Sequence, residues 1–291
     1  YVSKDELVQP EKYFPLKVKV CDKCWLVQTE DYAEAGELFN DDYAYFSSTS
    51  SGWLSHAKRY VEDIVERLSL DHESHVIEVA SNDGYLLKNF VSKGIPCLGI
   101  EPTASTAEAS EKLGIPVLQE FFGEDLGIRL AARHQKADLI LGNNVYAHVP
   151  DINDFTKGLK AALKSDGTVT LEFPHLLNLL EHNQFDTVYH EHFSYLSLYT
   201  VSQIFEKAGL KVFDVEKLST HGGSIRVFGC HIEHECSINT AVEDLLSEEK
   251  ESGLQSLDLY LKFQEKADKV KDDFLLFLLE QKKAGHKVAA Y

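Results

Sequence analysis

The sequence lacks features that would point to a membrane or a nucleic acid. No stretch approaches the roughly 18 uninterrupted apolar residues of a membrane helix, so we expect no transmembrane segment. Positive charge is scarce, with 29 Lys and Arg against 47 Asp and Glu and a net charge of −18. Nucleic acids and anionic membranes bind basic surfaces, so the sequence predicts neither as a partner. One anionic small molecule stays possible as a substrate, because a few local cationic side chains could hold it.

Cysteine is also scarce, and methionine is absent. Five cysteines, an odd number with no secretory leader in view, indicate a reducing compartment, so we expect the cytoplasm. The chain starts at Tyr1 and stops just after the apolar residues 288–290, and we expect the natural protein to extend beyond both ends. The length of 291 residues allows one α/β domain with smaller attachments. The sequence does not indicate an oligomeric state.

The first forty residues carry a cysteine pair between two short apolar runs. Residues 16–20 alternate like a strand, Cys21 and Cys24 follow in a CxxC turn, and an apolar run resumes at residues 26–27. A strand, a CxxC turn and a second strand outline a zinc knuckle, in which these two cysteines would be ligands. We therefore expect residues 1–40 to be the remainder of a zinc-binding module.

Short buried strands alternate with helices through the centre of the chain, which indicates βαβ units and a mostly parallel sheet. A helix over 53–68 precedes them. The expected strands are 75–79, 97–100, 116–118, 139–141 and 169–173, and the helices between them are 84–93, 106–113, 126–134 and 152–163. After a helix at 203–208, runs at 211–216 and 224–230 indicate an antiparallel hairpin that closes the sheet.

The rest of the chain looks different. Residues 241–283 are acidic and helical in pattern, and the residues from 288 onward read as the start of a strand. The sequence thus predicts an α/β protein in three parts: the zinc module, a Rossmann-like domain over 41–235, and a helical linker with the start of a C-terminal α/β domain over 236–291.

The turn after the first central strand is poor in glycine and carries negative charge. Ala80, Asn82 and Gly84 stand at the positions where dinucleotide-binding proteins place small residues. Glu78 in the strand and Asp83 in the turn would repel a pyrophosphate. They suit the cationic amino-acid end of S-adenosylmethionine, so we expect this turn to bind that cofactor.

Three further residues are candidate cofactor contacts. Glu101 ends the next strand, where a carboxylate can accept both ribose hydroxyl groups of an adenosine. A nicotinamide cofactor would use it in the same way. Phe122 could cover the adenine, with core packing as the alternative, and Asn144 follows the fourth strand at the ligand edge.

Ionisable side chains concentrate in residues 143–151 and 189–195. A neutral imidazole is the natural general base near pH 7 and contributes about 10²–10⁴-fold to a rate. The histidines expected at the ligand edge are His148, His175, His182, His190, His192 and His221. The His-Glu-His spacing at 190–192 is not the HExxH spacing of a helical zinc site, so we do not expect a catalytic metal.

Five sequence runs together resemble the sugar C-methyltransferases of deoxysugar biosynthesis. They are Ile77-Glu78-Val79-Ala80-Ser81-Asn82-Asp83-Gly84-Tyr85-Leu86-Leu87, Asn144-Val145-Tyr146-Ala147-His148-Val149-Pro150-Asp151, Glu172-Phe173-Pro174-His175, Tyr189-His190-Glu191-His192-Phe193-Ser194-Tyr195 and His221-Gly222-Gly223-Ser224. The resemblance implies a class I fold and S-adenosylmethionine-dependent methylation at C-3 or C-5 of a dTDP-4-keto-deoxysugar. It also implies an N-terminal zinc module and a C-terminal α/β domain.

The resemblance also assigns roles to residues. It implies His192 as the base that removes a proton beside the ketone, leaving an enolate. Tyr189, Glu191, His148 and Tyr43 would then surround the sugar. His175, His221 and Ser224 are the further substrate-binding candidates. The family holds zinc with two CxxC pairs, of which this sequence shows one, so the second pair is expected upstream.

Three other functions compete with this one. A nicotinamide-dependent nucleotide-sugar oxidoreductase would share the sheet and Glu101. An O- or N-methyltransferase would also use a histidine base. A non-catalytic nucleotide-sugar or protein-binding module would have no use for the run at 189–192.

Overall fold

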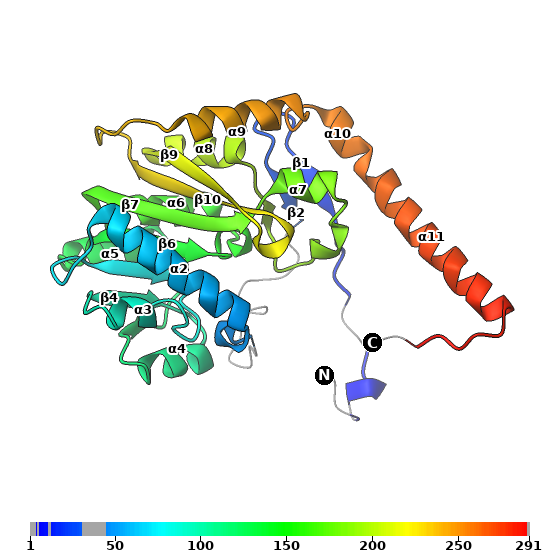
Figure 1. Ribbon diagram of the computed structural model, residues 1–291, viewed down its shortest axis with the longest axis horizontal. Coiled ribbons are helices and arrows are strands. Elements are labelled where there is room, and N and C mark those ends of the chain that lie inside the picture. The colour runs from blue at the N-terminus through cyan, green and yellow to red at the C-terminus, as the bar shows by residue number, and fades with distance from the viewer. Residues whose placement is uncertain (1–3, 5, 11–12, 31–44, 290–291) are drawn as a thin grey trace.

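A seven-stranded sheet organises the molecule. The computed structural model describes residue 4 and residues 6–10, 13–30 and 45–289. The strands of the large sheet are β3 (Val76–Val79), β4 (Cys97–Ile100), β5 (Val117–Leu118), β6 (Ala137–Asn143), β7 (Leu163–Pro174), β9 (Leu210–Leu218) and β10 (Ser224–His231). Their order is β5-β4-β3-β6-β7-β10-β9 (Figure 1).

The register of the sheet confirms the predicted α/β class. Strands β5, β4, β3, β6 and β7 are parallel, and β10 lies antiparallel between β7 and β9. The chain moves outward from β3 through β4 to β5 and then returns to the other side of β3 with β6. The strand order therefore reverses beside β3, which is where open α/β sheets bind ligands.

Helices cover both faces of the sheet, and each face has its own hydrophobic core. One core holds buried side chains from α5 (Glu124–Ala132), α6 (Ile152–Ala162), α8 (Leu198–Ala208) and α9 (Thr240–Glu251). The other holds side chains from α2 (Ser51–Leu68) and α3 (Lys88–Val91). The fold is thus a three-layer α/β sandwich, the class I methyltransferase arrangement that the sequence predicts.

Local signals explain where α2 begins and which face it buries. The Ser50 side chain accepts a hydrogen bond from the Trp53 amide and caps the helix, and Ser69 ends it in a left-handed conformation. Ala57, Val61 and Ile64 recur at helical spacing and are buried. This packing fixes the helix, so that its first turn lies beside the carboxyl ends of the strands.

The first expected strands form a second, smaller sheet. Strand β1 (Val18–Val20) pairs antiparallel with β2 (Val27–Thr29), as the sequence predicts. Strand β2 also pairs with β8 (Ser194–Tyr195), which the sequence analysis does not anticipate. Figure 1 shows β1 and β2 beside α7 (Leu176–Glu181), at one end of the large sheet.

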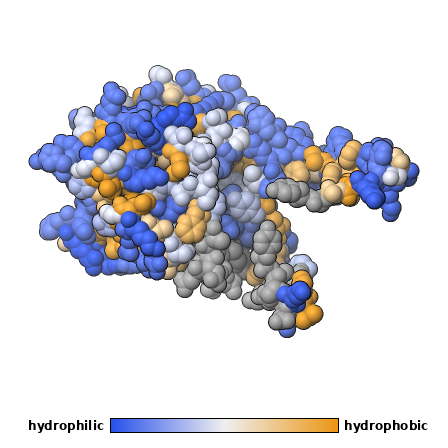
Figure 2. Space-filling view, turned by 60° about the horizontal axis from the view of Figure 1, so that its bottom comes forward, coloured by the Kyte–Doolittle hydropathy of each residue, from blue (hydrophilic) through white to orange (hydrophobic). Residues whose placement is uncertain are grey.

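The C-terminal residues form the predicted helices and then an arm. Helices α10 (Leu257–Leu261) and α11 (Phe263–Lys283) follow α9, and α11 projects from the body (Figure 1). No α11 residue is buried, and the arm shows hydrophobic beside hydrophilic side chains (Figure 2). Residues 286–289 lie in no strand, so the strand expected from residue 288 does not include residues 288 and 289.

Two smaller points complete the fold. The predicted helix 84–93 is reduced to α3 because the left-handed Gly84 and the turns after it delay the helix. Helix α4 is Ala104–Glu111, and the short 3-10 helices are Glu6–Val8, Ser47–Thr49, Tyr146–His148, Phe185–Thr187 and Thr220–Gly222. Among the described residues, no helix has the length and apolar character needed to cross a membrane.

Candidate active site

A cavity of about 700 Å³ opens at the carboxyl ends of the parallel strands. Val79, Ile100, Asn143 and Pro174 bring the ends of four strands to its wall. The predicted site residues that line it are Ala80, Asn82, Glu101, Phe122, Asn144, His148, Tyr189, Glu191, His192 and His221. Segments far apart in the sequence therefore meet at the edge where the strand order reverses. Tyr43 lies outside the described residues.

The turn after β3 holds its conformation through contacts with the segment before α2. Ala80 and Asn82 both have positive φ, at 57° and 50°. The Asn82 side chain accepts a hydrogen bond from the Ser47 amide at 2.9 Å and donates one to the Tyr45 carbonyl at 3.0 Å. Asp83 accepts from the Ser48 amide at 3.2 Å. These side chains therefore fasten residues 45–48 across the turn.

Gly84 closes the turn in a conformation that favours glycine. Its φ is +75°, and a Cβ there would lie 2.6 Å from the Ile115 side chain. Gly84 therefore serves close packing, and neither it nor Asp83 lines the cavity.

Glu101 presents a carboxylate that two backbone amides hold in place. One carboxylate oxygen accepts from the Asn82 amide at 2.9 Å and the other accepts from the Thr103 amide at 3.0 Å. The residue is 5% exposed and lines the cavity. A fixed acceptor at the end of the second strand is suited to a ribose diol, as the sequence predicts.

Three carboxyl groups, those of Glu78, Asp83 and Glu101, lie close together at the base of the turn. Burial raises the pKa of Glu78 well above its ordinary value, and the neighbouring Glu101 and Asp83 add to that shift. One Glu78 oxygen and one Asp83 oxygen are buried without a hydrogen-bond partner among the described residues. A positive group in the adjacent cavity would stabilise the ionised forms of these carboxyl groups, so the residues fit the sulfonium and ammonium groups of S-adenosylmethionine.

His192 is held from both sides of its ring. The Nδ1–H donates to the Thr187 carbonyl oxygen at 2.8 Å, since a carbonyl only accepts. Burial lowers the pKa of His192 despite that bond, and nearby His221 lowers it further, so the ring is neutral near pH 7. Its Nε2 therefore carries the lone pair, and it lies 2.9 Å from the Tyr189 hydroxyl, which donates to it.

A second imidazole packs against the first. The ring centroids of His148 and His192 are 4.7 Å apart. Burial lowers the pKa of His148 to about 3, and repulsion from His192 contributes. Two adjacent protonated imidazoles would repel each other, so His148 stays neutral when His192 gains a proton.

Tyr189 and Glu191 are partly exposed side chains in the wall of the cavity. Tyr189 is 40% exposed, and partial burial raises the pKa of its phenol. Burial likewise raises the pKa of Glu191. Both groups line the cavity and remain within reach of a ligand that enters from solvent.

Two predicted substrate contacts are placed elsewhere. His175 is 2% exposed, and its Nε2 lies 2.7 Å from Glu249 of α9. Ser224 is buried and donates to the Thr220 carbonyl at 3.0 Å. Neither lines the cavity, because both side chains are used in packing around β7 and β10.

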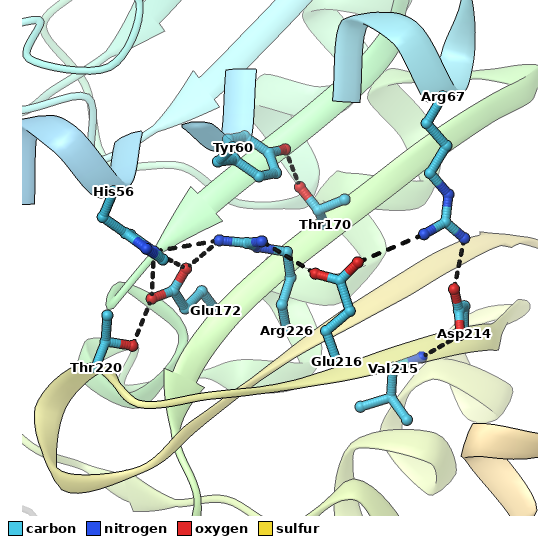
Figure 3. Close-up of polar contacts among 10 residues, drawn as sticks. All are labelled: His56, Tyr60, Arg67, Thr170, Glu172, Asp214, Val215, Glu216, Thr220 and Arg226. Carbon is cyan, nitrogen blue, oxygen red and sulfur yellow. Dashed lines mark hydrogen bonds and ion pairs between the residues drawn. The ribbon is translucent and has the colours of Figure 1, made fainter. Parts of the chain in front are cut away.

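The sequence analysis missed a buried charge network beside the cavity (Figure 3). The Glu172 carboxylate contacts Arg226 at 2.6 Å, His56 at 2.8 Å and the Thr220 hydroxyl at 2.9 Å. Burial raises the pKa of Glu172, but the His56 hydrogen bond and the Arg226 charge outweigh it, so the carboxyl remains ionised. Thr220 precedes His221, and the network thus fixes the loop that brings His221 to the cavity.

The CxxC turn between β1 and β2 is compact. The Trp25 amide donates to the Cys21 carbonyl, and the Cys21 amide donates to the Leu26 carbonyl, both at 3.0 Å. Backbone amides of Cys24 and Lys23 lower the pKa of the exposed Cys21 thiol. That favours the thiolate form that binds zinc. Within the described ranges no three candidate ligands gather at one point.

Family models match nearly the whole chain in three segments. Residues 1–39 match a family described as "Putative zinc binding domain", residues 53–215 match "Methyltransferase domain", and residues 219–291 match "C-methyltransferase C-terminal domain". The chain is 34% identical over 281 residues to the C-methyltransferase NovU of Streptomyces niveus. The aligned region covers 97% of this chain and 67% of that protein.

This chain belongs to the C-methyltransferase family. It is an S-adenosylmethionine-dependent methyltransferase, as its sequence predicts, so the oxidoreductase and the non-catalytic module are excluded.

Two methyltransferases are among the solved structures to which this chain is similar. Magnesium protoporphyrin IX methyltransferase of Synechocystis with bound SAH gives a TM-score of 0.48 at 14% identity, covering 67% of this chain and 91% of that one. An S-adenosylmethionine-dependent methyltransferase of Clostridium acetobutylicum gives a TM-score of 0.49 at 12% identity, and the match covers 67% of this chain and 95% of that one.

Proposed function

We propose that this enzyme methylates a ring carbon beside the ketone of a dTDP-linked 4-keto-deoxysugar. The observation that carries the proposal is the buried His192, which lines the cavity and donates its Nδ1–H to the Thr187 carbonyl, so that Nε2 keeps its lone pair. An O- or N-methyltransferase also uses a base, but carbon is not nucleophilic until it loses a proton. A buried imidazole with a fixed tautomer is suited to that step.

The proposed reaction consists of proton removal by His192 followed by methyl transfer to the carbon. Once the Tyr189 hydroxyl turns its hydrogen away from His192 Nε2, that nitrogen takes the proton from the carbon beside the ketone. The electron pair of that C–H bond stays on the substrate as an enolate. S-adenosylmethionine supplies the methyl group, whose bond to sulfur breaks as the enolate carbon forms its new bond. After proton transfer, His192 Nε2–H can donate to the Tyr189 oxygen that lay 2.9 Å away.

The other cavity residues would bind and orient the sugar. Tyr189 or His221 can donate to the developing enolate oxygen, and such a donor is worth about 10²–10³-fold in rate. Glu191 and Tyr43 are proposed to bind sugar hydroxyl groups. His148, which stays neutral, would leave His192 as the acceptor of the proton.

Cofactor binding is proposed for the opposite half of the cavity. Glu101 would accept the ribose hydroxyl groups, and Phe122 and Asn144 would contact the adenosine. Ala80 and the Asn82 backbone would lie against the methionine part.

We further propose zinc in the N-terminal module, with Cys21 and Cys24 as two of its four ligands. The other two ligands are expected in the second CxxC pair upstream of Tyr1, so metal analysis of the full-length protein tests this. About one zinc per chain is expected, and changing Cys21 to Ser should remove it, whereas a protein folded and active without zinc would exclude the site.

Solvent exchange tests the proposed reaction. The enzyme is incubated in D₂O with dTDP-4-keto sugars and without methyl donor, and deuterium should enter the carbon beside the ketone. His192→Asn should abolish this exchange while S-adenosylmethionine still binds. The matched control is His182→Asn, because the His182 side chain is exposed and does not line the cavity, contrary to the expectation from the sequence. An exchange rate in His192→Asn equal to that of the unmodified enzyme would sink the proposal.

A further inference from the structure

The N-terminal sheet is connected directly to the segment that carries His192. Strands β2 and β8 pair antiparallel, with Val27 opposite Tyr195 and Gln28 opposite Ser194. Beyond this pairing, the Thr29 amide donates to the Phe193 carbonyl at 3.1 Å. The backbone hydrogen bonds between β2 of the N-terminal module and the segment of β8 therefore continue towards His192, the proposed base.

The last contact of this ladder is made by a side chain. The Thr29 hydroxyl donates to the His192 carbonyl oxygen at 3.1 Å. His192 itself is 9% exposed, so water cannot easily replace a lost donor there. One hydroxyl on β2 thus satisfies the backbone acceptor of the residue whose ring must meet the substrate.

The backbone around His192 has little regular structure of its own. Residues 188–193 belong to no helix or strand. The His192 amide donates to the Tyr189 carbonyl at 3.1 Å, within the same turn. The contact with Thr29 therefore attaches this turn to a different part of the fold.

The strand that carries Thr29 is itself held in place at its beginning. The Gln203 side chain of α8 donates to the Cys24 carbonyl at 3.1 Å. The Trp25 ring stacks on Tyr260, with ring centroids 6.4 Å apart. The turn before β2 is thus fixed to helices of the main body, which makes β2 a firm support.

We infer that Thr29 is a positioning residue for His192, and that the N-terminal module thereby sets the geometry of the catalytic base. The inference rests on the proposed function, in which His192 removes the proton. Proton transfer needs donor and acceptor within about 2.6–3.2 Å, and a displacement of 1 Å can cost about 10²-fold in rate. Loss of the hydroxyl should therefore slow proton removal more than it weakens substrate binding.

The test uses the full chain and compares three substitutions. Thr29→Val keeps the branched shape that suits a strand but removes the donor, Thr29→Ser keeps the donor, and Gln28→Val changes an exposed neighbour on the same strand. Thr29→Val should lower both deuterium exchange and kcat by about tenfold, with KM within about twofold. Thr29→Ser and Gln28→Val should remain within about threefold of the original enzyme.

Each outcome bears on one claim. Exchange and kcat in Thr29→Val equal to those of the original enzyme would overturn the inference, and so would equal losses in Thr29→Val and Thr29→Ser. If Thr29→Val fails to fold, Thr29→Ala and Thr29→Ser pose the same question, since they differ by the hydroxyl alone. Undiminished exchange in His192→Asn would instead refute the proposed function, whatever the Thr29 variants do.

Discussion

Removal of the Arg226 charge should expose how strongly the buried network holds the site together. The Glu172 side chain is 0% exposed and that of Arg226 is 6% exposed. Breaking a buried ion pair by deleting one partner costs about 3–5 kcal/mol, because the remaining charge stays buried. His56 and Thr220 still contact Glu172, so we expect Arg226→Met to lower the free energy of unfolding by about 3 kcal/mol, the lower end of that range.

A double-mutant cycle separates this pair from general damage to the core. Glu172→Leu combined with Arg226→Met removes both charges, and the combined loss should be smaller than the sum of the two single losses. We expect a coupling free energy of about 2–3 kcal/mol. The control is the surface pair of Lys157 and Glu124, whose side chains are 52% and 44% exposed, and its coupling should be below about 1 kcal/mol.

Urea unfolding followed by tryptophan fluorescence measures each corner of the cycle. Trp53 stacks on His56 with ring centroids 5.0 Å apart, so it reports on this region. A loss below about 1 kcal/mol in Arg226→Met, or a coupling no larger than that of the surface pair, would refute the reasoning. If the coupling free energy is as expected but Arg226→Met has the same KM for the sugar substrate as the original enzyme, the network stabilises the fold without placing His221.

Three further predictions concern the base, the cofactor and the turn after β3. Burial holds the pKa of His192 below its ordinary value, so the base stays neutral as the pH is lowered. We therefore expect kcat to stay level down to about pH 6.5, and a decline in kcat that already begins above about pH 7 on acidification would contradict this. Glu101→Gln should raise the Kd for S-adenosylmethionine about ten- to a hundredfold in calorimetry, while the exposed Glu108→Gln leaves it unchanged; equal affinities would exclude the ribose contact. Gly84→Ala should lower the free energy of unfolding by more than about 1 kcal/mol, since φ is +75° and its Cβ would meet Ile115; a thermal midpoint equal to that of the original protein would contradict this.

Local patterns were enough to predict most of the large sheet. The continuous apolar run of β3 and the strands alternating with helices require no knowledge of distant residues. Strand β8 is different, because it has two residues and exists only through its pairing with β2. Nothing in the local sequence at 194–195 could indicate a partner so far upstream.

The candidate site shows the same limit. Glu101 and Asn144 follow directly on strands, and their place at the cavity is a consequence of strand direction. His175 also follows a strand, yet its ring lies against Glu249. The same carboxylate accepts from the Leu198 and Tyr199 amides at the start of α8, so burial of Glu249 depends on three separate segments. No sequence spacing contains that information.

The division of charge in the cavity explains how one site could serve two unlike ligands. Glu78 and Glu101 belong to the ends of β3 and β4, where carboxylates favour a cation. His148 and His192 line the same cavity, and burial lowers both imidazole pKa values and keeps the rings neutral. A sulfonium near Glu101 would therefore be stabilised, while His192, the proposed base, would not be protonated in advance. A fixed difference in environment, rather than any one residue, would then keep the methyl donor and the proton acceptor apart until a substrate carbon lies between them.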